Sequence, residues 1–137
     1  MIAETSPAVD ALVQLSFAVT RTLTACAAEQ NLSLTQLRLL GVLRDRTPTM
    51  AAIADLLELD RSSISGLIDR AESRGLVTRR ASSDDGRVVT VELSEDGKAV
   101  ATRLAERVTA TIAELLDGSS ARQRESLVGL ANAIGMN

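Results

Sequence analysis

The stretch from Pro48 to Leu93 restricts the fold of this chain more than any other part of the sequence. Two helix-forming runs lie close together, and Gly75 ends the second, as is typical of a left-handed residue after a helix. Two β-like segments follow around a polar tip that contains Asp85 and Gly86, a strong turn signal. The order is helix, break, helix, strand, tip and strand, over residues 50–57, 58–60, 61–74, 76–80, 82–87 and 87–93. This order predicts a winged helix-turn-helix.

The second helix of the pair has an apolar face and a polar face. Apolar residues recur at steps of three and four, which predicts an inward stripe of Ile64, Leu67, Ile68 and Ala71. The opposite face is small and polar, and it comprises Arg61, Ser62, Ser63, Ser65, Gly66, Asp69 and Arg70. Such a helix fits a DNA major groove about 12 Å wide and can form hydrogen bonds with base edges. An ordinary solvated face is the alternative, but the preceding helix and the following hairpin favour recognition.

Two further features predict contacts with a DNA backbone. Thr49 is placed to cap the helix that starts at Met50, whose first-turn N–H groups would face a phosphate. Its buried side is expected to hold Ile53, Ala54, Leu56 and Leu57. Arg87 follows the hairpin tip, where a long cationic side chain reaches the narrow minor groove. Asp85 lies two residues earlier and is predicted to hold the guanidinium by a charge-assisted hydrogen bond. A surface ion pair of little energetic weight is the alternative for Asp85 and Arg87.

The charges are unevenly distributed along the chain. The net charge of −3 argues by itself against a nucleic-acid partner, but residues 61–87 hold six arginines and four acidic residues. A basic face on an acidic body favours steering to phosphates. Fourteen of the fifteen cations are arginine, which binds phosphate and guanine bidentately, although genome composition alone can produce this preference. Because the serine-rich face has little reach, we expect DNA binding to depend heavily on Arg70, Arg79, Arg80 and Arg87.

Amphipathic helices are predicted on both sides of this unit. The first runs from Ser6–Pro7 to about Glu29, with apolar residues over a wide face. The others follow Ser94 and Ser120, the latter forming a capping box with Gln123. These helices carry more apolar surface than one small winged helix needs, so pairing across a two-fold axis is predicted. A central core helix is the alternative for the first. The single domain 1–137 thus divides into a winged-helix lobe, 34–93, and dimerisation helices, 6–30 and 95–135.

Composition excludes several classes of protein. Phe17 is the sole aromatic residue, so the core must be aliphatic. The chain has no histidine and one cysteine, Cys26, which leaves no intramolecular disulfide and disfavours transition-metal sites and hydrolase chemistry. We therefore predict no enzymatic activity, no cofactor and no metal. Neither a signal peptide nor an apolar run near the roughly 18 residues of a membrane span is expected, so the predicted location is cytoplasmic.

Four stretches in order resemble the MarR family, the multiple-antibiotic-resistance regulators of bacteria and archaea. They are residues 34–40, 53–57, 60–77 and 85–97. The last contains the wing signature of Asp85, one residue, Arg87, five residues, and then Leu93 with Ser94. The resemblance implies a mostly α fold with a small β-hairpin wing (α+β). It also implies an obligate homodimer whose two winged helices read a palindromic operator in double-stranded DNA.

What the family resemblance implies for function is transcriptional regulation, usually repression. In this family a small molecule or an oxidant often relieves binding from a pocket between the dimer helices and the lobe. By position, Arg87 would be the minor-groove arginine and Asp85 its holder. The side that faces bases and phosphates would hold Ser62, Ser63, Ser65 and Arg70.

The sequence departs from this pattern in two places. Gly66 stands where many relatives carry a longer polar or basic side chain. Ser16 stands where the peroxide-sensing branch has a reactive cysteine, and Cys26, on the apolar face, is expected to be inert. An effector pocket is expected to be aliphatic, with Phe17, Arg21 and Arg38 as candidate ligand contacts. The competing function is a winged-helix protein-interaction module that does not bind DNA, which the salt dependence of DNA affinity would separate from a regulator.

Overall fold

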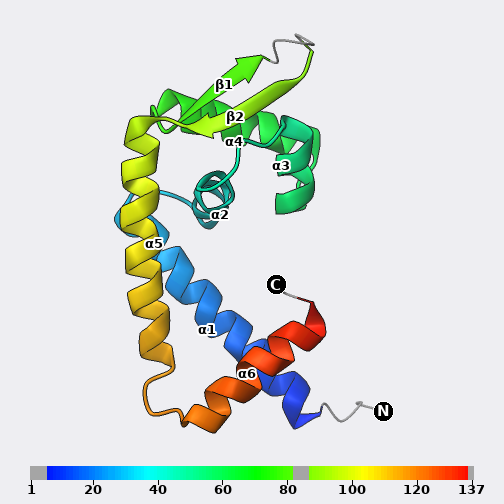
Figure 1. The fold of residues 1–137 in the computed structure, drawn as a ribbon, viewed down its shortest axis with the longest axis vertical. Helices are drawn as coiled ribbons and strands as arrows, with labels where there is room; N and C mark the ends of the chain where they lie inside the picture. Colours follow the sequence, from blue (N-terminus) through cyan, green and yellow to red (C-terminus); the bar gives the residue numbers. More distant parts are fainter. Residues whose placement is uncertain (1–5, 82–86, 136–137) are drawn as a thin grey trace.

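A computed structural model describes residues 6–81 and 87–135 of the chain. Within these ranges the chain forms six helices and one two-stranded hairpin (Figure 1). The elements are α1 (Pro7–Glu29), α2 (Leu34–Leu43), α3 (Met50–Leu57), α4 (Arg61–Ser73), β1 (Val77–Ala81), β2 (Val89–Leu93), α5 (Glu95–Leu115) and α6 (Ala121–Ile134). The predicted class, a mostly α fold with a small hairpin wing, is confirmed.

Side-chain caps explain where the helices begin. Ser33 and Ser120 form full capping boxes with Gln36 and Gln123, so two otherwise unpaired N–H groups are satisfied at each helix start. The hydroxyl of Thr49 accepts from the Ala52 N–H at 3.1 Å and starts α3. The caps at Thr49 and Ser120 were predicted from the sequence, and the structure confirms them.

The core lies in one aliphatic cluster where α2, α3, α4, the hairpin and the first half of α5 meet. All four predicted inward residues of α4 are buried, as is Cys26 of α1. Leu56, expected on the buried side of α3, is instead 44% exposed. An eight-residue helix makes little more than two turns, so a residue one step from the stripe already faces solvent.

The hairpin is fixed to the helices at both ends. Its strands are antiparallel, in a register from Val77–Leu93 to Ala81–Val89. On the open side of β2, the Val91 N–H donates to the Pro48 carbonyl at 3.0 Å, just before α3. At the other end the Ser94 N–H donates to the Leu76 carbonyl, also at 3.0 Å. The wing is therefore tied to α3 and to α5.

Gly97 permits the close approach between α5 and the start of the hairpin. A Cβ atom at this position would lie 1.9 Å from the Leu76 carbonyl oxygen, a distance no real contact allows. Only glycine therefore fits in this first turn of α5.

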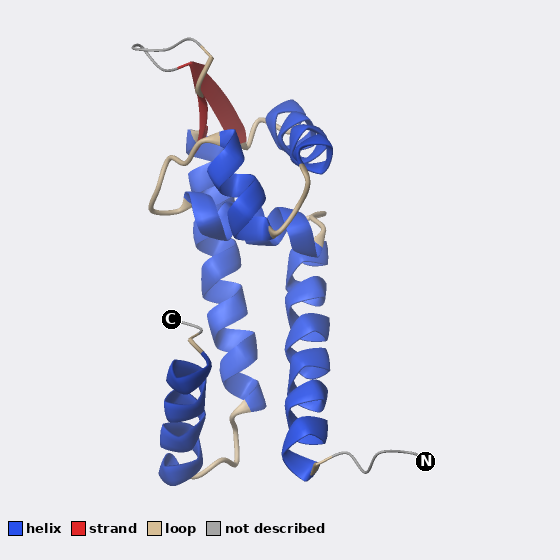
Figure 2. Cartoon of the chain, turned by 90° about the vertical axis from the view of Figure 1, so that its right-hand side faces the viewer, coloured by secondary structure: helices blue, strands red, loops and turns tan. Residues whose placement is uncertain are grey.

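The remaining helical segments extend away from the lobe (Figure 2). They are most of α1, the second half of α5, and α6, and we call them the arms. Glu29 at the end of α1 and Arg107 of α5 form an ion pair at 3.0 Å. No residue of α6 is buried. Many large apolar side chains of the arms are exposed: Val9, Leu12, Val13, Leu15, Phe17, Leu115, Leu127, Val128, Leu130 and Ile134.

The absence of a long uninterrupted apolar run does not describe α1 fully. By length and composition α1 is long and apolar enough to cross a membrane, with a mean hydropathy of 1.3 in its most apolar window. The alanines of this helix keep the average high although no uninterrupted apolar run is long. This property is weak evidence by itself, because helices of soluble proteins that are covered by other helices share it.

Candidate nucleic-acid interface

The polar face of α4 is held in place from its first residue. Asp60 caps the helix, and its Oδ1 accepts from the Ser63 N–H and from the Ser62 hydroxyl, both at 2.8 Å. These hydrogen bonds, chiefly that from the Ser63 N–H, lower the pKa of Asp60. Arg61, Ser62, Ser63, Ser65, Asp69 and Arg70 are exposed, while Gly66 is half-buried. The face is therefore shallow and polar, as predicted, but the Ser62 hydroxyl already donates within the chain.

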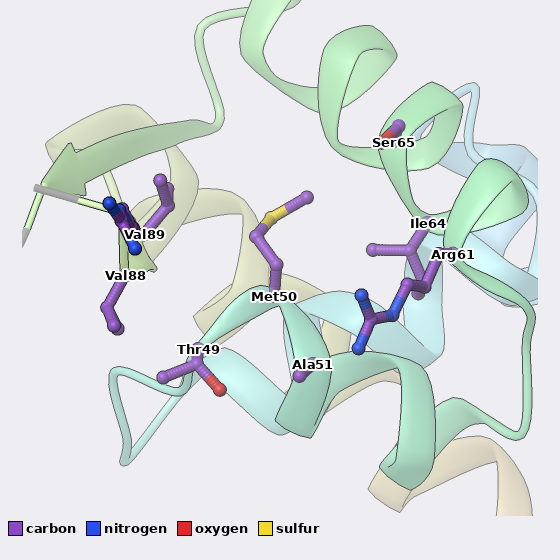
Figure 3. Close-up of a pocket in the computed structure, with 9 residues that line it drawn as sticks. Thr49, Met50, Ala51, Arg61, Ile64, Ser65, Val88 and Val89 are labelled. Atoms are coloured by element: carbon purple, nitrogen blue, oxygen red, sulfur yellow. The ribbon is translucent and has the colours of Figure 1, made fainter.

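A groove of about 460 Å³ lies between α3, α4 and the wing (Figure 3). It is lined by Thr49, Met50, Ala51, Arg61, Ile64, Ser65, Arg87, Val88 and Val89. Met50 projects into the middle, with Val89 on one side and Ile64 and Arg61 on the other (Figure 3). The fold thus brings four predicted DNA contacts, from three separate elements, around one hollow: Thr49, Arg61, Ser65 and Arg87.

The groove is lined by apolar residues and by two arginines. Arg61 comes from the first turn of α4 and Arg87 from the residue just beyond the tip, two residues before β2. An extended polyanion such as a nucleic-acid backbone fits a hollow lined by guanidinium groups from two separate elements. The sequence prediction did not include the lining residues Met50 and Val88. Two sequence features could have indicated them: Met50 is an apolar residue at the first position of a capped helix, and Val88 is an apolar residue next to Arg87.

Gly66 gives Arg70 a particular position. A Cβ atom at Gly66 would lie 3.1 Å from Nη1 of Arg70, so the guanidinium folds back over the bare backbone one turn earlier. Because glycine has no side chain, the Arg70 guanidinium has room to lie against the backbone at this position. The Arg70 cation therefore sits closer to the middle of the α4 face than its place in the sequence suggests.

Three arginines of the basic segment are held by groups of the chain itself. Arg79 pairs with Asp69 at 2.6 Å and with Glu72 at 2.8 Å, and these contacts raise its pKa, the Asp69 hydrogen bond most of all. Arg80 pairs with Glu92 across the hairpin. Arg74 donates to the carbonyls of Asn31 at 2.7 Å and Gln30 at 3.0 Å. The structure therefore does not bring Arg79 and Arg80 to the groove.

The strand period of two could have indicated this difference. Val77 and Arg79 share one face of β1, opposite Leu93 and the fully buried Val91, so Arg79 projects toward the helices. Arg80 lies on the outer face. Asp85, the predicted holder of Arg87, lies outside the described residues.

The candidate ligand contacts are not part of the three best-formed cavities of the described residues. Phe17, Arg21 and Arg38 are exposed, and none of them lines these three cavities. An apolar cavity of about 230 Å³ instead lies between α2 and α5. It is lined by Leu37, Leu40, Gly41, Arg44, Ala101, Leu104, Ala105, Val108 and Thr109. Arg44 is the cation at this cavity, and the step of three or four from Leu37 through Leu40 and Gly41 could have predicted it.

The fold and the groove define a winged-helix protein with long helical arms, and comparison with known proteins shows which family it resembles. Residues 30–88, which contain α2, α3, α4 and the first strand of the wing, match the model of the MarR family. In sequence the winged-helix lobe is therefore similar to MarR-family proteins, and nearly the whole chain has the fold of MarR. A comparison with curated protein sequences gave no match.

Solved structures extend this likeness over nearly the whole chain. Wild-type MarR from E. coli in its apo form is 21% identical, with a TM-score of 0.83 and coverage of 97% of this chain and 99% of that one. The repressor CouR bound to a 23-mer DNA duplex is 22% identical, with a TM-score of 0.81 and coverage of 98% and 99%. NadR in complex with 4-hydroxyphenylacetate is 21% identical, with a TM-score of 0.77 and coverage of 98% and 96%. At this identity the likeness concerns the fold.

Proposed function

We propose that the protein is a homodimeric, sequence-specific DNA-binding regulator that represses transcription from a palindromic operator. The observation that carries the proposal is the groove in which Arg61 of α4 and Arg87 of the wing flank one hollow beside an exposed polar helix. Its similarity to CouR, which is a repressor in complex with DNA, supports the same function.

The division of labour follows from side-chain length. The serines on α4 are short, so direct contacts with base edges require the helix to lie deep in the major groove. Arg61 and Arg87 are long enough to bind the sugar-phosphate backbone, and Arg87 to enter the minor groove. Arg70, folded over Gly66, is the long donor closest to the middle of the α4 face. We therefore infer a binder that relies on phosphates and groove shape more than on many base contacts.

The dimer is inferred from the arms. α6 has no buried residue, and α1 exposes large apolar side chains along its first half. Leaving so much apolar surface in water is unfavourable by about 25 cal/mol per Å². A second copy supplies a matching apolar surface across a two-fold axis, as isologous interfaces do. Pairing also places two α4 helices at a fixed spacing, which a palindromic operator requires.

DNA binding is tested by selecting duplexes from a random pool with the wild-type protein and measuring the affinity of the enriched duplex at several salt concentrations. A regulator loses affinity steeply with salt, because each neutralised phosphate contributes about 0.9 to the slope of log K against log salt. We expect Arg87→Ala to weaken binding by about 10-fold, or about 1.4 kcal/mol, and to make the slope shallower by about 0.9.

Arg103→Ala, on the exposed side of α5 far from the groove, is the matched control and should leave affinity and slope unchanged. Failure to enrich any duplex would instead favour a winged-helix module that binds proteins. Unchanged binding by the Arg87 variant would remove the wing from the interface.

We further propose an effector site in the α2–α5 cavity, whose apolar lining and Arg44 suit a small amphipathic carboxylate. NadR in complex with 4-hydroxyphenylacetate provides a probe of this class. Added 4-hydroxyphenylacetate should release the selected duplex from the wild type and not from Arg44→Ala. If it releases both equally, or neither, the proposed site is wrong.

A further inference from the structure

We propose that Arg79 is a positioning residue that sets the recognition helix against the wing, and that it does not contact DNA. The inference rests on the proposed DNA-binding function and revises the role that the sequence suggested for this arginine. It starts from a face: Arg79 shares the inward side of β1 with Val77, directly across from Val91.

The contacts of Arg79 point to α4. Its Nη2 lies 2.6 Å from the Asp69 carboxylate and its Nη1 lies 2.8 Å from that of Glu72. The Arg79 side chain is 30% exposed, against 71% for Arg80 on the other face of the same strand. One planar guanidinium thus bridges two acids that lie one turn apart on the helix, a geometry that a single-point ammonium cannot reproduce.

The position of Asp69 makes this bridge relevant to DNA reading. Residues three and four apart share a helix face, so Asp69 lies one turn after Ser65, which lines the groove, and Ser65 one turn after Ser62. The ion pair between Arg79 and Asp69 therefore fixes the rotation of α4 about its axis, and with it the direction in which Ser62 and Ser65 point. It also sets the distance between Arg61 and Arg87, because Arg61 moves with α4 and Arg87 with the wing.

The bridge also accounts for two acids beside a surface meant for a polyanion. Asp69 is exposed on the predicted DNA face, where a carboxylate repels phosphates. With Arg79 between them, Asp69 and Glu72 contribute a net charge of about −1 instead of −2. Because Asp69 and Glu72 neutralise the charge of Arg79 within the protein, Arg79 adds nothing to the release of counterions from DNA.

The test compares salt slopes and specificity in the full-length protein, with the duplex enriched by the wild type and a scrambled duplex of equal length. For Arg79→Gln we expect about a 10-fold loss of affinity for the enriched duplex, or about 1.4 kcal/mol. The salt slope should not change, and the scrambled duplex should lose much less affinity than the enriched one, because only the uncovered charges of Asp69 and Glu72 act on it. A phosphate-contacting arginine would instead make the slope shallower by about 0.9 and weaken both duplexes equally. Arg79→Lys should rescue little if two acids must be bridged, and most of the binding if the role is a phosphate contact.

The paired acids give a second readout with opposite signs. Asp69→Asn combined with Glu72→Gln removes two negative charges near the DNA, which by charge alone strengthens binding to both duplexes. A positioning role predicts that the ratio of specific to non-specific affinity falls about as far as in Arg79→Gln, and that adding Arg79→Gln lowers it little more. An unchanged ratio overturns the proposal. A general loss of folded protein lowers both affinities together and leaves the ratio as it was.

Arg80→Gln is the matched control, because it removes the same charge from the adjacent residue without touching α4. Amide hydrogen exchange without DNA adds a measurement that does not depend on an operator. The backbone of α4 should exchange faster in Arg79→Gln than in Arg80→Gln. Equal exchange in the two variants refutes the positioning role. If the wild type enriches no duplex while α4 loosens in Arg79→Gln, the DNA-binding proposal has failed and the bridge remains a structural strut only.

Discussion

Two helices of nearly equal length, α4 in the lobe and α6 in the arms, show what an apolar stripe does and does not determine. α4 has 13 residues and α6 has 14, each begins at a side-chain cap, and each is followed by a glycine with positive φ. The four stripe residues of α4 are buried, yet none of α6 is. Periodicity thus identifies the apolar face of a helix. The apolar face of α4 is covered by the rest of its own chain, whereas that of α6 still requires a partner.

This difference divides the chain by the origin of its stability. The stripe of α4 packs into the aliphatic core and stabilises each subunit by itself. Burial of the α6 stripe depends on a second copy, so its contribution rises with protein concentration. The loss of stability caused by a substitution in the lobe should therefore be independent of protein concentration, whereas that caused by a substitution in the arms should depend on it.

The largest effect is expected from a charge in the arms. Leu130→Glu and Leu12→Glu each place a carboxylate in the proposed dimer surface, where an unpaired buried charge costs several kcal/mol. Size-exclusion chromatography with light scattering should show a monomer in place of the dimer, with loss of operator binding. Gln14→Glu on an exposed polar position of α1 is the control and should remain dimeric. Dimers in all three variants would place the interface elsewhere.

The next effect separates the two stripes directly. Ile68→Ala in α4, fully buried, should lower the free energy of unfolding by about 2–5 kcal/mol at any protein concentration. Leu130→Ala in α6 should cost less, and its cost in urea unfolding should fade as the protein is diluted. If the Leu130 variant lost the same free energy at every concentration, α6 would be covered within its own chain.

Two helical glycines provide a smaller comparison. Gly97→Ala drives a methyl group into the Leu76 carbonyl and should cost about 1–3 kcal/mol or more. Gly129→Ala in α6 meets no atom within 4 Å and should stabilise its helix by about 0.5–1 kcal/mol. Urea unfolding of both variants checks the pair. A neutral Gly97 variant would mean that α5 can move away from the hairpin at little cost.

Local chemistry made much of the fold readable from the sequence. Caps at Ser33, Thr49, Asp60 and Ser94, and the glycine after α4, are decided within a few residues of the chain. The α4 stripe was equally readable because 13 residues give enough turns for the period of 3.6 to be clear. Leu56 was misplaced because α3 offers only eight residues.

The site was readable only in part, because partners far apart in sequence decide what an arginine does. Six arginines in one segment predicted a basic face, but Asp69 and Glu72 take up Arg79, and Glu92 takes up Arg80. Composition counts these charges and cannot say which acid lies opposite which cation. The bridge from Pro48 to Val91, which sets α3 beside the wing, is a single long-range hydrogen bond without a sequence signal.

The smallest effect contrasts one carboxylate of the lobe with one of the arms, through pH. Hydrogen bonds from Ser63 lower the pKa of Asp60, and the Arg107 hydrogen bond lowers that of Glu29, from ordinary values of 3.8 and 4.5. A pKa lowered by folding stabilises the folded state above the ordinary value, and this stability is lost as the pH falls through the lowered pKa.

Unfolding free energies measured from about pH 6 to pH 3 should therefore fall less steeply in Arg107→Gln and in Asp60→Asn. Asn retains a capping side chain, so the Asp60 variant should differ from wild type mainly in this slope. Because both carboxylates are exposed, each change should be slight, and Arg107→Gln should keep the contribution of Asp60. A wild-type slope in Arg107→Gln would show that the ion pair between α1 and α5 contributes nothing in solution.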